Sequence, residues 1–335
     1  YVKLYAFDGF LTTFMTCLLT IIFLMGFKWG INGYLSAIII TDALSALFLF
    51  FSARLYKNIK FKGLDKRTFK MMLRYAIPMI PTTLLWWIVS VSDRYIITYM
   101  LGADANGLYA AAYKIPTIVV LVSTIFMDAW QVSAVSEIKD RRALAKFFSN
   151  VFRGYQSIIF LAGSLLIPFS KICTIILVAG DYYESWRYIP FLMLATIYNC
   201  MVQFMGSVYM IERKGVTTLI TSIIAAATNI VGNFILIPIC GVNGAAYSTC
   251  FSYFIVFVIR AIHTRKFIRI NYSVLKFGVN AILTLAQAVI MITEVPGWII
   301  YEVILTLLVL LLNIKVLILS FKKIVGRFGR KKAKT

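Results

Sequence analysis

Charged residues are scarce in this chain. They make up 14% of its 335 residues, whereas a typical soluble domain has about 25%. Hydrophobic residues account for 61% of the sequence, and the mean hydropathy is +0.86. This composition excludes a water-soluble globular domain and is typical of a protein with many membrane-spanning segments. We therefore predict an all-α, polytopic membrane helix bundle.

Residues that carry out catalysis or bind metals are also few. The sequence has one histidine, His263, and five cysteines without the spacing of a metal site. It contains no HExxH motif, no glycine-rich phosphate loop and no Cys–His pairing. We expect a protein that is not an enzyme and that needs no metal or other cofactor. The cysteines, which lie in or beside apolar segments, are Cys17, Cys173, Cys200, Cys240 and Cys250.

Acidic residues are outnumbered by basic ones. The chain has 13 aspartates and glutamates against 34 lysines and arginines, which gives a net charge of +21. A balance this basic often indicates nucleic-acid binding. Here the cations fall in short loops between apolar segments, so we exclude nucleic acid as a partner. We expect these loops to contact anionic membrane lipids instead.

Ten apolar runs are long enough to span a membrane. Most of the lysines and arginines lie in alternate loops, which the positive-inside rule places in the cytoplasm. Both ends of this chain are then cytoplasmic, in agreement with an even number of spans. The predicted spans are 9–27, 33–53, 76–101, 107–131, 155–170 with a broken continuation to 179, 188–211, 216–238, 244–263, 277–294 and 298–319.

Two of the predicted cytoplasmic segments have a character of their own. Residues 54–74 form a strongly basic linker after the second span. Residues 137–152 place apolar side chains on one helical face, which is typical of an amphipathic helix on the inner leaflet. That face consists of Leu144, Phe147, Phe148, Val151 and Phe152.

A short motif occurs twice, at the start of the second and of the eighth span. Its copies are the runs GING at 30–33 and GVNG at 241–244. The repetition indicates two duplicated six-helix lobes, the first of them incomplete here, and we expect an N-terminally truncated version of a longer protein. The predicted parts are 1–53 as the last two helices of the N-terminal lobe, 54–74 as a basic cytoplasmic linker, 75–263 as the complete C-terminal six-helix lobe, and 264–335 as two extra helices with a basic cytoplasmic tail.

Four ionisable residues lie inside the third and fourth spans: Asp93, Arg94, Lys114 and Asp128. Such a residue costs about 2.5–3.5 kcal/mol on insertion scales, so we expect the four to line a cavity. The alternative is a closed structural pair, either Asp93 with Lys114 or Asp128 with an arginine. Prolines are expected to break the helices of the third, fourth and fifth spans: Pro78, Pro81, Pro116 and Pro168.

Polar residues also align on other spans. Asn229 and Asn233 share one face of the seventh span. Asn280, Thr284 and Gln287 share one face of the ninth. For the ninth span we interpret this face as hydrogen bonds between packed helices, each worth about 0.6–2 kcal/mol.

Three stretches of the sequence resemble a known transporter family. They are LRYAIP at 73–78 continuing through SDRY at 92–95, GLYAAAYKI at 107–115, and YYESW at 182–186 before Ile189-Pro190. These stretches are similar to the oligosaccharide flippases of the polysaccharide biosynthesis transporter family. That family belongs to the multidrug/oligosaccharidyl-lipid/polysaccharide exporter superfamily.

The resemblance implies two six-helix lobes around a central cavity. It implies a protein that flips polyprenyl-diphosphate-linked oligosaccharide across the bacterial plasma membrane by alternating access, for cell-surface polysaccharide synthesis. The implied partners are the lipid-linked oligosaccharide and a polysaccharide polymerase or glycosyltransferases. On this basis Arg94 and Lys114 are predicted to bind the diphosphate, and Asp93 and Asp128 to couple an ion or form charge pairs. Adjacent helical residues point about 100° apart, so we expect Arg94 to face the cavity and Asp93 a neighbouring helix.

Two other functions remain open at this point. A multidrug or cation antiporter of similar fold should have a more acidic and aromatic cavity, so Arg94 and Lys114 count against it. A membrane-embedded glycan polymerase or acyltransferase should have a large extracytoplasmic loop or a buried catalytic histidine. The predicted outer loops are short, and His263 lies at a cytoplasmic helix end.

Overall fold

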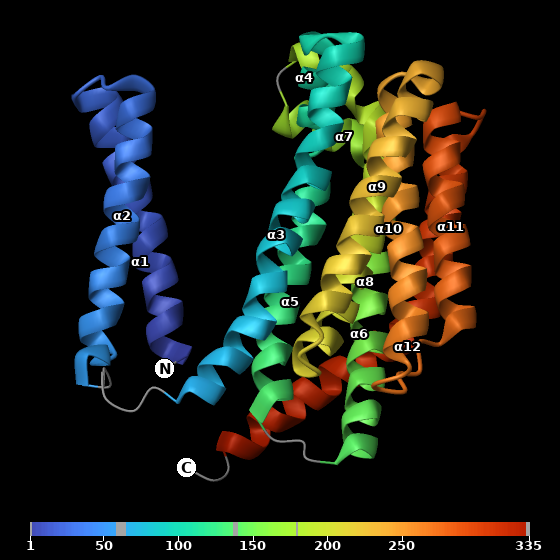
Figure 1. Cartoon of the computed structure of the whole chain (residues 1–335). Coiled ribbons are helices and arrows are strands. Elements are labelled where there is room, and N and C mark those ends of the chain that lie inside the picture. The colour runs from blue at the N-terminus through green and yellow to red at the C-terminus, as the bar shows by residue number, and fades with distance from the viewer. Residues whose placement is uncertain (1, 58–64, 137–139, 179, 333–335) are drawn as a thin grey trace. The chain divides into compact units, whose positions relative to one another are not determined.

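The computed structural model describes residues 2–57, 65–136, 140–178 and 180–332 of the chain (Figure 1). Over these ranges the regular elements are all helices. The chain divides into two compact units, Tyr1–Met71 and Met72–Thr335.

The helices have the length and surface of membrane spans. Eight in the described part of the chain are long and apolar enough to cross a membrane, or up to ten if each bent pair is one span. Large apolar side chains point outward, as on surfaces that face lipid: Ile176 is 73% exposed and Leu275 is 83% exposed. The prediction of an all-α, multi-pass membrane bundle with about ten spans is confirmed.

Unit 1 is a helical hairpin. Its elements are α1 (Val2–Ile21), the π-helical turn η1 (Ile22–Gly26), α2 (Gly30–Ser52) and the 3₁₀ turn η2 (Leu55–Lys57). α1 and α2 pack side by side in opposite directions (Figure 1). The hydroxyl of Ser45 donates to the two carboxylate oxygens of Asp8 at 2.9 and 3.0 Å. Hydropathy alone does not reveal this buried carboxylate in the predicted N-terminal lobe fragment.

Unit 2 begins within α3 and contains all later helices. Its elements are α3 (Lys66–Leu101), α4 (Ala103–Ala112), α5 (Pro116–Ser136), α6 (Arg141–Leu166), α7 (Ser170–Leu177), the 3₁₀ segment η3 (Gly180–Tyr188), α8 (Ile189–Ile211), α9 (Gly215–Cys240), α10 (Val242–Thr264), α11 (Val274–Thr293) and α12 (Trp298–Lys332). α10 packs along both α9 and α8, and α12 packs on α6 and α11.

Part of the predicted basic linker is helical. The linker was predicted to span residues 54–74. In the structure Asp65 caps α3, and the first turns of α3 include residues 66–74. The Asp65 carboxylate accepts a hydrogen bond from the Thr68 hydroxyl and two from backbone N–H groups, which lowers the pKa of Asp65. Residues 58–64 of the linker and 137–139 of the predicted surface helix lie outside the described residues.

The hairpin of α3 and α4 turns more tightly than predicted. The predicted spans 76–101 and 107–131 leave residues 102–106 for the turn between them. In the structure α4 begins immediately after Gly102, whose φ of 94° favours glycine. α3 itself continues through Pro78 and Pro81, so the predicted breaks there are wrong. The hydroxyl of Thr82 donates to the Pro78 carbonyl at 2.8 Å. Such local bonds help a proline-containing helix in lipid to keep its backbone groups paired.

Two other spans are broken where proline was expected to break them. α4 and α5 meet at 44°, with residues 113–115 between them and Pro116 as the first residue of α5. α6 and α7 meet at 75° around Pro168. Proline has no N–H to continue the helical hydrogen bonds. The first of these breaks places Lys114 outside regular helix.

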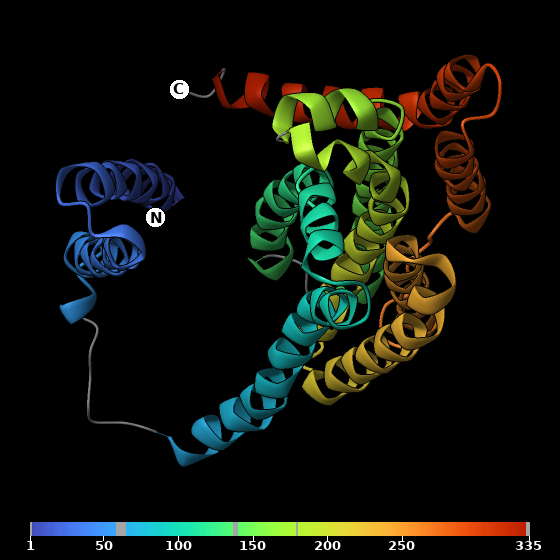
Figure 2. The same cartoon turned by 90° about the horizontal axis from the view of Figure 1, so that it is seen from above.

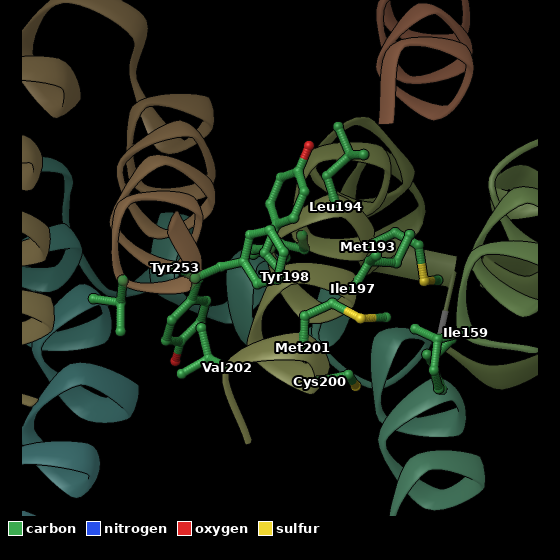
Figure 3. Packing of buried hydrophobic residues seen from close by; sticks show 14 of the residues in the cluster. Ile159, Met193, Leu194, Ile197, Tyr198, Cys200, Met201, Val202 and Tyr253 are labelled. Carbon is green, nitrogen blue, oxygen red and sulfur yellow. The ribbon is translucent and has the colours of Figure 1, made fainter. Parts of the chain in front are cut away.

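α8 is the central helix of unit 2. It contacts α5, α6, α10 and α11, and most of its residues are buried. In Figure 3 the labelled core side chains come from α8, except Ile159 of α6 and Tyr253 of α10. A helix that is hydrophobic all round belongs in the interior of a bundle. α8 thereby fixes the positions of α5 and α10, which carry much of the candidate site.

The apolar face of α6 is covered by protein. Residues 137–152 were predicted to lie on the inner leaflet, but residues from Arg141 onward belong to one continuous helix that is also the fifth span. Phe148 and Phe152 are fully buried against Phe204 of α8, with ring centroids 6.1 and 5.2 Å apart. The surface-helix prediction is therefore wrong for the described residues. Helical periodicity identifies an apolar face but does not say whether lipid or protein covers it.

α11 and α12 lie beside each other at one side of unit 2 (Figure 2). The Gln287 side-chain amide of α11 donates to Glu302 at 3.1 Å and to Thr306 at 2.9 Å on α12. It also donates to the backbone carbonyl of Ser164 on α6 at 3.2 Å, and the Ser164 hydroxyl donates back at 2.8 Å. The polar face of the ninth span thus bonds packed helices together, as predicted from the sequence.

The two copies of the repeated motif have similar local geometry. Gly30 at the start of α2 has a φ of 55°, and Gly241 immediately before α10 has a φ of 60°. In both copies the second glycine lies close to the preceding segment. A Cβ on Gly33 would come within 3.0 Å of a neighbouring atom, and one on Gly244 within 2.2 Å. These turns agree with a duplicated element, and the superposition of the two lobes remains a prediction.

We expect Gly244→Ala to destabilise unit 2 by about 1–3 kcal/mol, because overpacking forces the backbone apart. The new Cβ would lie 2.2 Å from the Leu236 carbonyl oxygen, which is backbone and cannot rotate away. The control is Gly278→Ala in α11, where a Cβ meets nothing within 4 Å. Thermal unfolding in detergent should show a lower midpoint for the first variant only. Equal midpoints would contradict the close helix contact.

Candidate functional site

The polar residues of α3 divide into two environments. Asp93 is 1% exposed and points into unit 2, toward α4, α9 and α10. Arg94 is exposed on the surface of unit 2. A turn of about 100° between adjacent residues accounts for this separation. The adjacent charged residues therefore belong to two different parts of the candidate site.

Four neutral groups donate hydrogen bonds to the buried carboxylate of Asp93. Oδ2 accepts from the Tyr109 hydroxyl of α4 and the Thr249 hydroxyl of α10, each at 2.7 Å. Oδ1 accepts from the side-chain amides of Asn229 at 3.0 Å and Asn233 at 2.7 Å, one turn apart on α9. Donors of this number stabilise a negative charge that would otherwise be costly in the membrane.

The pocket around Asp93 has a second layer of polar contacts. The Asn229 amide also donates to the Thr249 hydroxyl at 3.0 Å, and its own carbonyl accepts from Ser92 at 2.9 Å. The side-chain oxygen of Asn233 is buried and has no hydrogen-bond partner among the described residues. Hydroxyl and amide donors thus surround the Asp93 carboxylate, which can take up a proton. The pocket could hold a small hard cation only if the Asn229 and Asn233 amides turned their oxygens toward it.

The predicted pair of Asp93 with Lys114 is not formed. Lys114 is exposed at the break between α4 and α5, whereas the carboxylate is enclosed by neutral donors. Within the described residues, neither Arg94 nor Lys114 has a carboxylate oxygen within 4.0 Å. Both cations are therefore available at the surface of unit 2.

Arg94 belongs to a narrow polar stripe along α3. Its other members occur at helical spacing and are exposed: Thr83, Trp87, Ser90 and Thr98. α5 carries a comparable exposed stripe, with Thr117, Thr124 and Asp128. The two stripes contrast with the apolar surface expected where a helix faces lipid. This polar face, defined by these residues together with Lys114, is the exposed part of the candidate site.

Asp128 lines a cavity of about 380 Å³ within unit 2. Trp86, Gln203 and Arg260 line the same cavity. Arg260 is only 2% exposed. Sequence reasoning missed it because it was grouped with the cations of a cytoplasmic loop. The signal was present, since Arg260 lies inside the predicted span 244–263 rather than after it.

The comparison with protein families covers the first part of the chain. The profile of the family described as "Polysaccharide biosynthesis protein" matches residues 8–131, a range that includes Asp93, Arg94, Lys114 and Asp128. The predicted family resemblance is confirmed. The polysaccharide biosynthesis profile thus spans the hairpin of unit 1 and the polar face of unit 2. No curated protein sequence matches the chain.

Solved structures of two kinds of transporter are similar to the chain. A multidrug resistance MATE family transporter of the MOP superfamily, in an outward-facing conformation, is 13% identical with a TM-score of 0.61; the match covers 78% of this chain and 61% of that one. A MATE protein in complex with MaL6 is 11% identical with a TM-score of 0.65, at the same coverage of 78% and 61%. The lipid II flippase MurJ, in an inward closed conformation, is 16% identical with a TM-score of 0.59, and the match covers 94% of this chain and 67% of that one.

These likenesses show a shared fold. The chain spans about 61% of the length of the MATE transporters that it matches. The chain is a multi-pass helical protein whose first part, residues 8–131, matches the polysaccharide biosynthesis profile.

Proposed function

We propose that this protein flips polyprenyl-diphosphate-linked oligosaccharide across the bacterial plasma membrane by alternating access. The product would serve cell-surface polysaccharide synthesis. The observation that carries the proposal is the exposed polar face of unit 2, where two cations without nearby carboxylates sit among hydroxyl and aromatic side chains. The polysaccharide biosynthesis match and the MurJ-like fold support the same substrate class.

Arg94 and Lys114 have complementary roles in this proposal. The planar guanidinium of Arg94 can bind two phosphate oxygens at once, whereas the ammonium of Lys114 acts as a mobile point charge. Lys114 lies at the break between α4 and α5, where irregular backbone suits a cavity lining. Together the two cations would attract the diphosphate while the hydroxyls of the stripe contact sugar.

Asp93 is the proposed coupling residue. Its pocket can bind a proton or a small cation, and it joins α3 to α4, α9 and α10. Occupancy would therefore change how these helices pack. Asp128, which is exposed and lines the cavity shared by α3, α5, α8, α9 and α10, is a second carboxylate that can take up a proton. Asp128 differs from Asp93 because its carboxylate can contact a ligand bound in that cavity directly.

The basic loops support the proposed topology and partners. With these loops on the cytoplasmic side, both ends of the chain are cytoplasmic and Arg94 and Lys114 lie in the outer half of the membrane. The loops would contact anionic lipid headgroups. A polysaccharide polymerase or glycosyltransferases are the proposed functional partners, because they would consume or supply the lipid-linked oligosaccharide.

A multidrug exporter is the second candidate function, favoured by the fold shared with the MATE structures. Such a protein would need acidic groups for cationic drugs. The exposed polar face carries Arg94 and Lys114 against Asp128 alone among its charged members. This charge balance favours an anionic substrate.

The test is export of glycan to the cell surface by a strain that depends on this protein. We expect Arg94→Ala and Lys114→Ala each to lower export by at least about tenfold, which corresponds to loss of one charge-assisted contact. Arg94→Lys should keep part of the activity. Tyr99→Ala is the control, because Tyr99 is 86% exposed on the same helix and lies outside the polar face. Full export in the Arg94→Ala, Lys114→Ala double variant would refute the diphosphate role.

A further inference from the structure

Arg260 is a buried cation without an anionic partner. It lies in α10, inside a membrane span, and is 2% exposed. Within the described part of the chain, no carboxylate oxygen comes within 4.0 Å of its guanidinium. Buried charges in proteins are normally paired, because an isolated charge is expensive to desolvate. The missing anion can therefore come from a ligand.

The hydrogen bonds of Arg260 use only part of its donor capacity. Its Nε and Nη2 donate to the Thr221 hydroxyl at 3.1 and 2.8 Å, and Nη1 donates to the Val202 carbonyl at 2.9 Å. A guanidinium has five N–H groups, so two remain without an acceptor among the described residues. The rings of Trp86 and Tyr209 hold it in place, with centroids 5.6 and 5.7 Å away. The guanidinium group of Arg260 is therefore fixed in position before any ligand binds.

The free donors are accessible from the cavity that Arg260 lines. Gly206 of α8 lines the same cavity, and a Cβ at this position would lie 3.1 Å from Nη1. Because Gly206 has no side chain, Nη1 is open on that side. The cavity has a volume of about 380 Å³, which falls within the range of small-ligand sites of about 300–1,000 Å³. Gln203 provides a further polar group in its wall.

We propose that Arg260 forms a phosphate-binding subsite in this cavity, whose wall includes Thr83, Thr124 and Asp128 of the polar face but neither Arg94 nor Lys114. A phosphate group suits it better than a carboxylate, because it presents several oxygens to a fixed fork while the remaining ones face the open cavity. The identity of the ligand rests on the proposed function, since the subsite would bind the same lipid-linked substrate. It would hold the phosphate of an anionic lipid-linked ligand before or after contact with Arg94.

The charge of Asp128 should affect anion binding at the subsite. Its carboxylate lines the same cavity and would repel a bound phosphate. Removing that charge should therefore tighten anion binding. Anion binding and neutralisation of Asp128 then favour each other, which links the two ligands through one cavity.

The probe is inorganic pyrophosphate, titrated by calorimetry into the purified full chain in detergent at low ionic strength. We expect Arg260→Gln to weaken binding at least about tenfold and Asp128→Asn to strengthen it. The matched control is Arg265→Gln, which removes the same charge from an exposed position on the same stretch of chain, outside this cavity. Binding by Arg260→Gln equal to that of the unaltered protein would overturn the proposal.

A second variant separates binding from folding. Gly206→Ala keeps the arginine and its three hydrogen bonds but places a methyl group against Nη1. We expect pyrophosphate to raise the unfolding temperature of the unaltered protein more than that of Gly206→Ala, in which only the Arg94 and Lys114 surface can still bind it. A purely structural arginine would give the same rise, or none, in both proteins, which would refute the subsite.

Two displacement experiments distinguish the source of the phosphate. Displacement of pyrophosphate by phosphatidylglycerol micelles would identify a membrane lipid headgroup, and displacement by farnesyl diphosphate alone would identify an isoprenoid diphosphate. The subsite and the proposed function fail separately. If Arg260→Gln weakens pyrophosphate binding while the Arg94→Ala, Lys114→Ala variant exports glycan normally, the subsite stands and the proposed diphosphate role of Arg94 and Lys114 falls.

Discussion

The Asp93→Asn variant is expected to lose glycan export entirely while remaining folded in the membrane. Asparagine has nearly the same size and keeps an oxygen for the Tyr109 and Thr249 hydroxyls, which donate at 2.7 Å in the unaltered protein. Its NH2 group replaces Oδ1, and Asn233 can turn its unpaired side-chain oxygen toward this new donor. It has no negative charge with which to take up a proton or a cation. The helices around the pocket would then be held in one arrangement regardless of ion gradients. Surface glycan and the amount of protein in the membrane are the two measurements.

The control for this variant is Asp104→Asn, an exposed carboxylate at the start of α4. It should export glycan normally. Comparing export in proteoliposomes under a sodium gradient and under a proton gradient would identify the coupled ion. Normal export by Asp93→Asn would remove Asp93 from the coupling mechanism and leave it as a structural group.

Gln287→Leu is expected to loosen α12 from α6 and α11, at a cost of about 2 kcal/mol. The change removes hydrogen bonds to Glu302, Thr306 and Ser164 together. Each bond between membrane helices contributes about 0.6–2 kcal/mol, and the Glu302 carboxyl would be left buried without its amide partner. Thermal unfolding in detergent should show a clear loss. Leu285→Ala is the control, because Leu285 is 44% exposed on the same helix.

A double-mutant cycle makes this prediction sharper. Glu302 is fully buried, and its Oε1 has no hydrogen-bond partner among the described residues. Removing both polar groups in Gln287→Leu, Glu302→Leu should therefore cost less than the sum of the single changes. Strict additivity would show that the amide and the carboxyl do not interact.

Several features of the fold could be predicted because they depend on length, composition or one residue type. The spans follow from apolar runs, and the breaks at Pro116 and Pro168 follow from the missing N–H of proline. Pro78 and Pro81 did not break α3, since a bend also depends on what packs around the helix. The covering of the α6 face could not be predicted, because lipid and protein are equally apolar surroundings.

The candidate site was predictable only in part. Burial of a carboxylate in a span indicated the importance of Asp93, and the helical angle separated it from Arg94. Its partners on α9 and α10 could not be chosen, because Asn233 and Thr249 lie 140 and 156 residues further along the chain. The predicted span 244–263 includes Arg260, but only the fold shows that its guanidinium turns inward rather than toward the lipid headgroups.

The long sequence separation within the Asp93 pocket has a consequence for the synthesis of the protein. α3 leaves the ribosome long before α9 and α10, and the Thr249 hydroxyl follows Asp93 by 156 residues. At about 5–20 residues per second, the carboxylate waits roughly 8–30 s for its donors. During that time it has only the nearby Tyr109 as a partner from the finished pocket. α3 must therefore stay beside the translocation channel, or in contact with an insertion factor, until the later helices arrive.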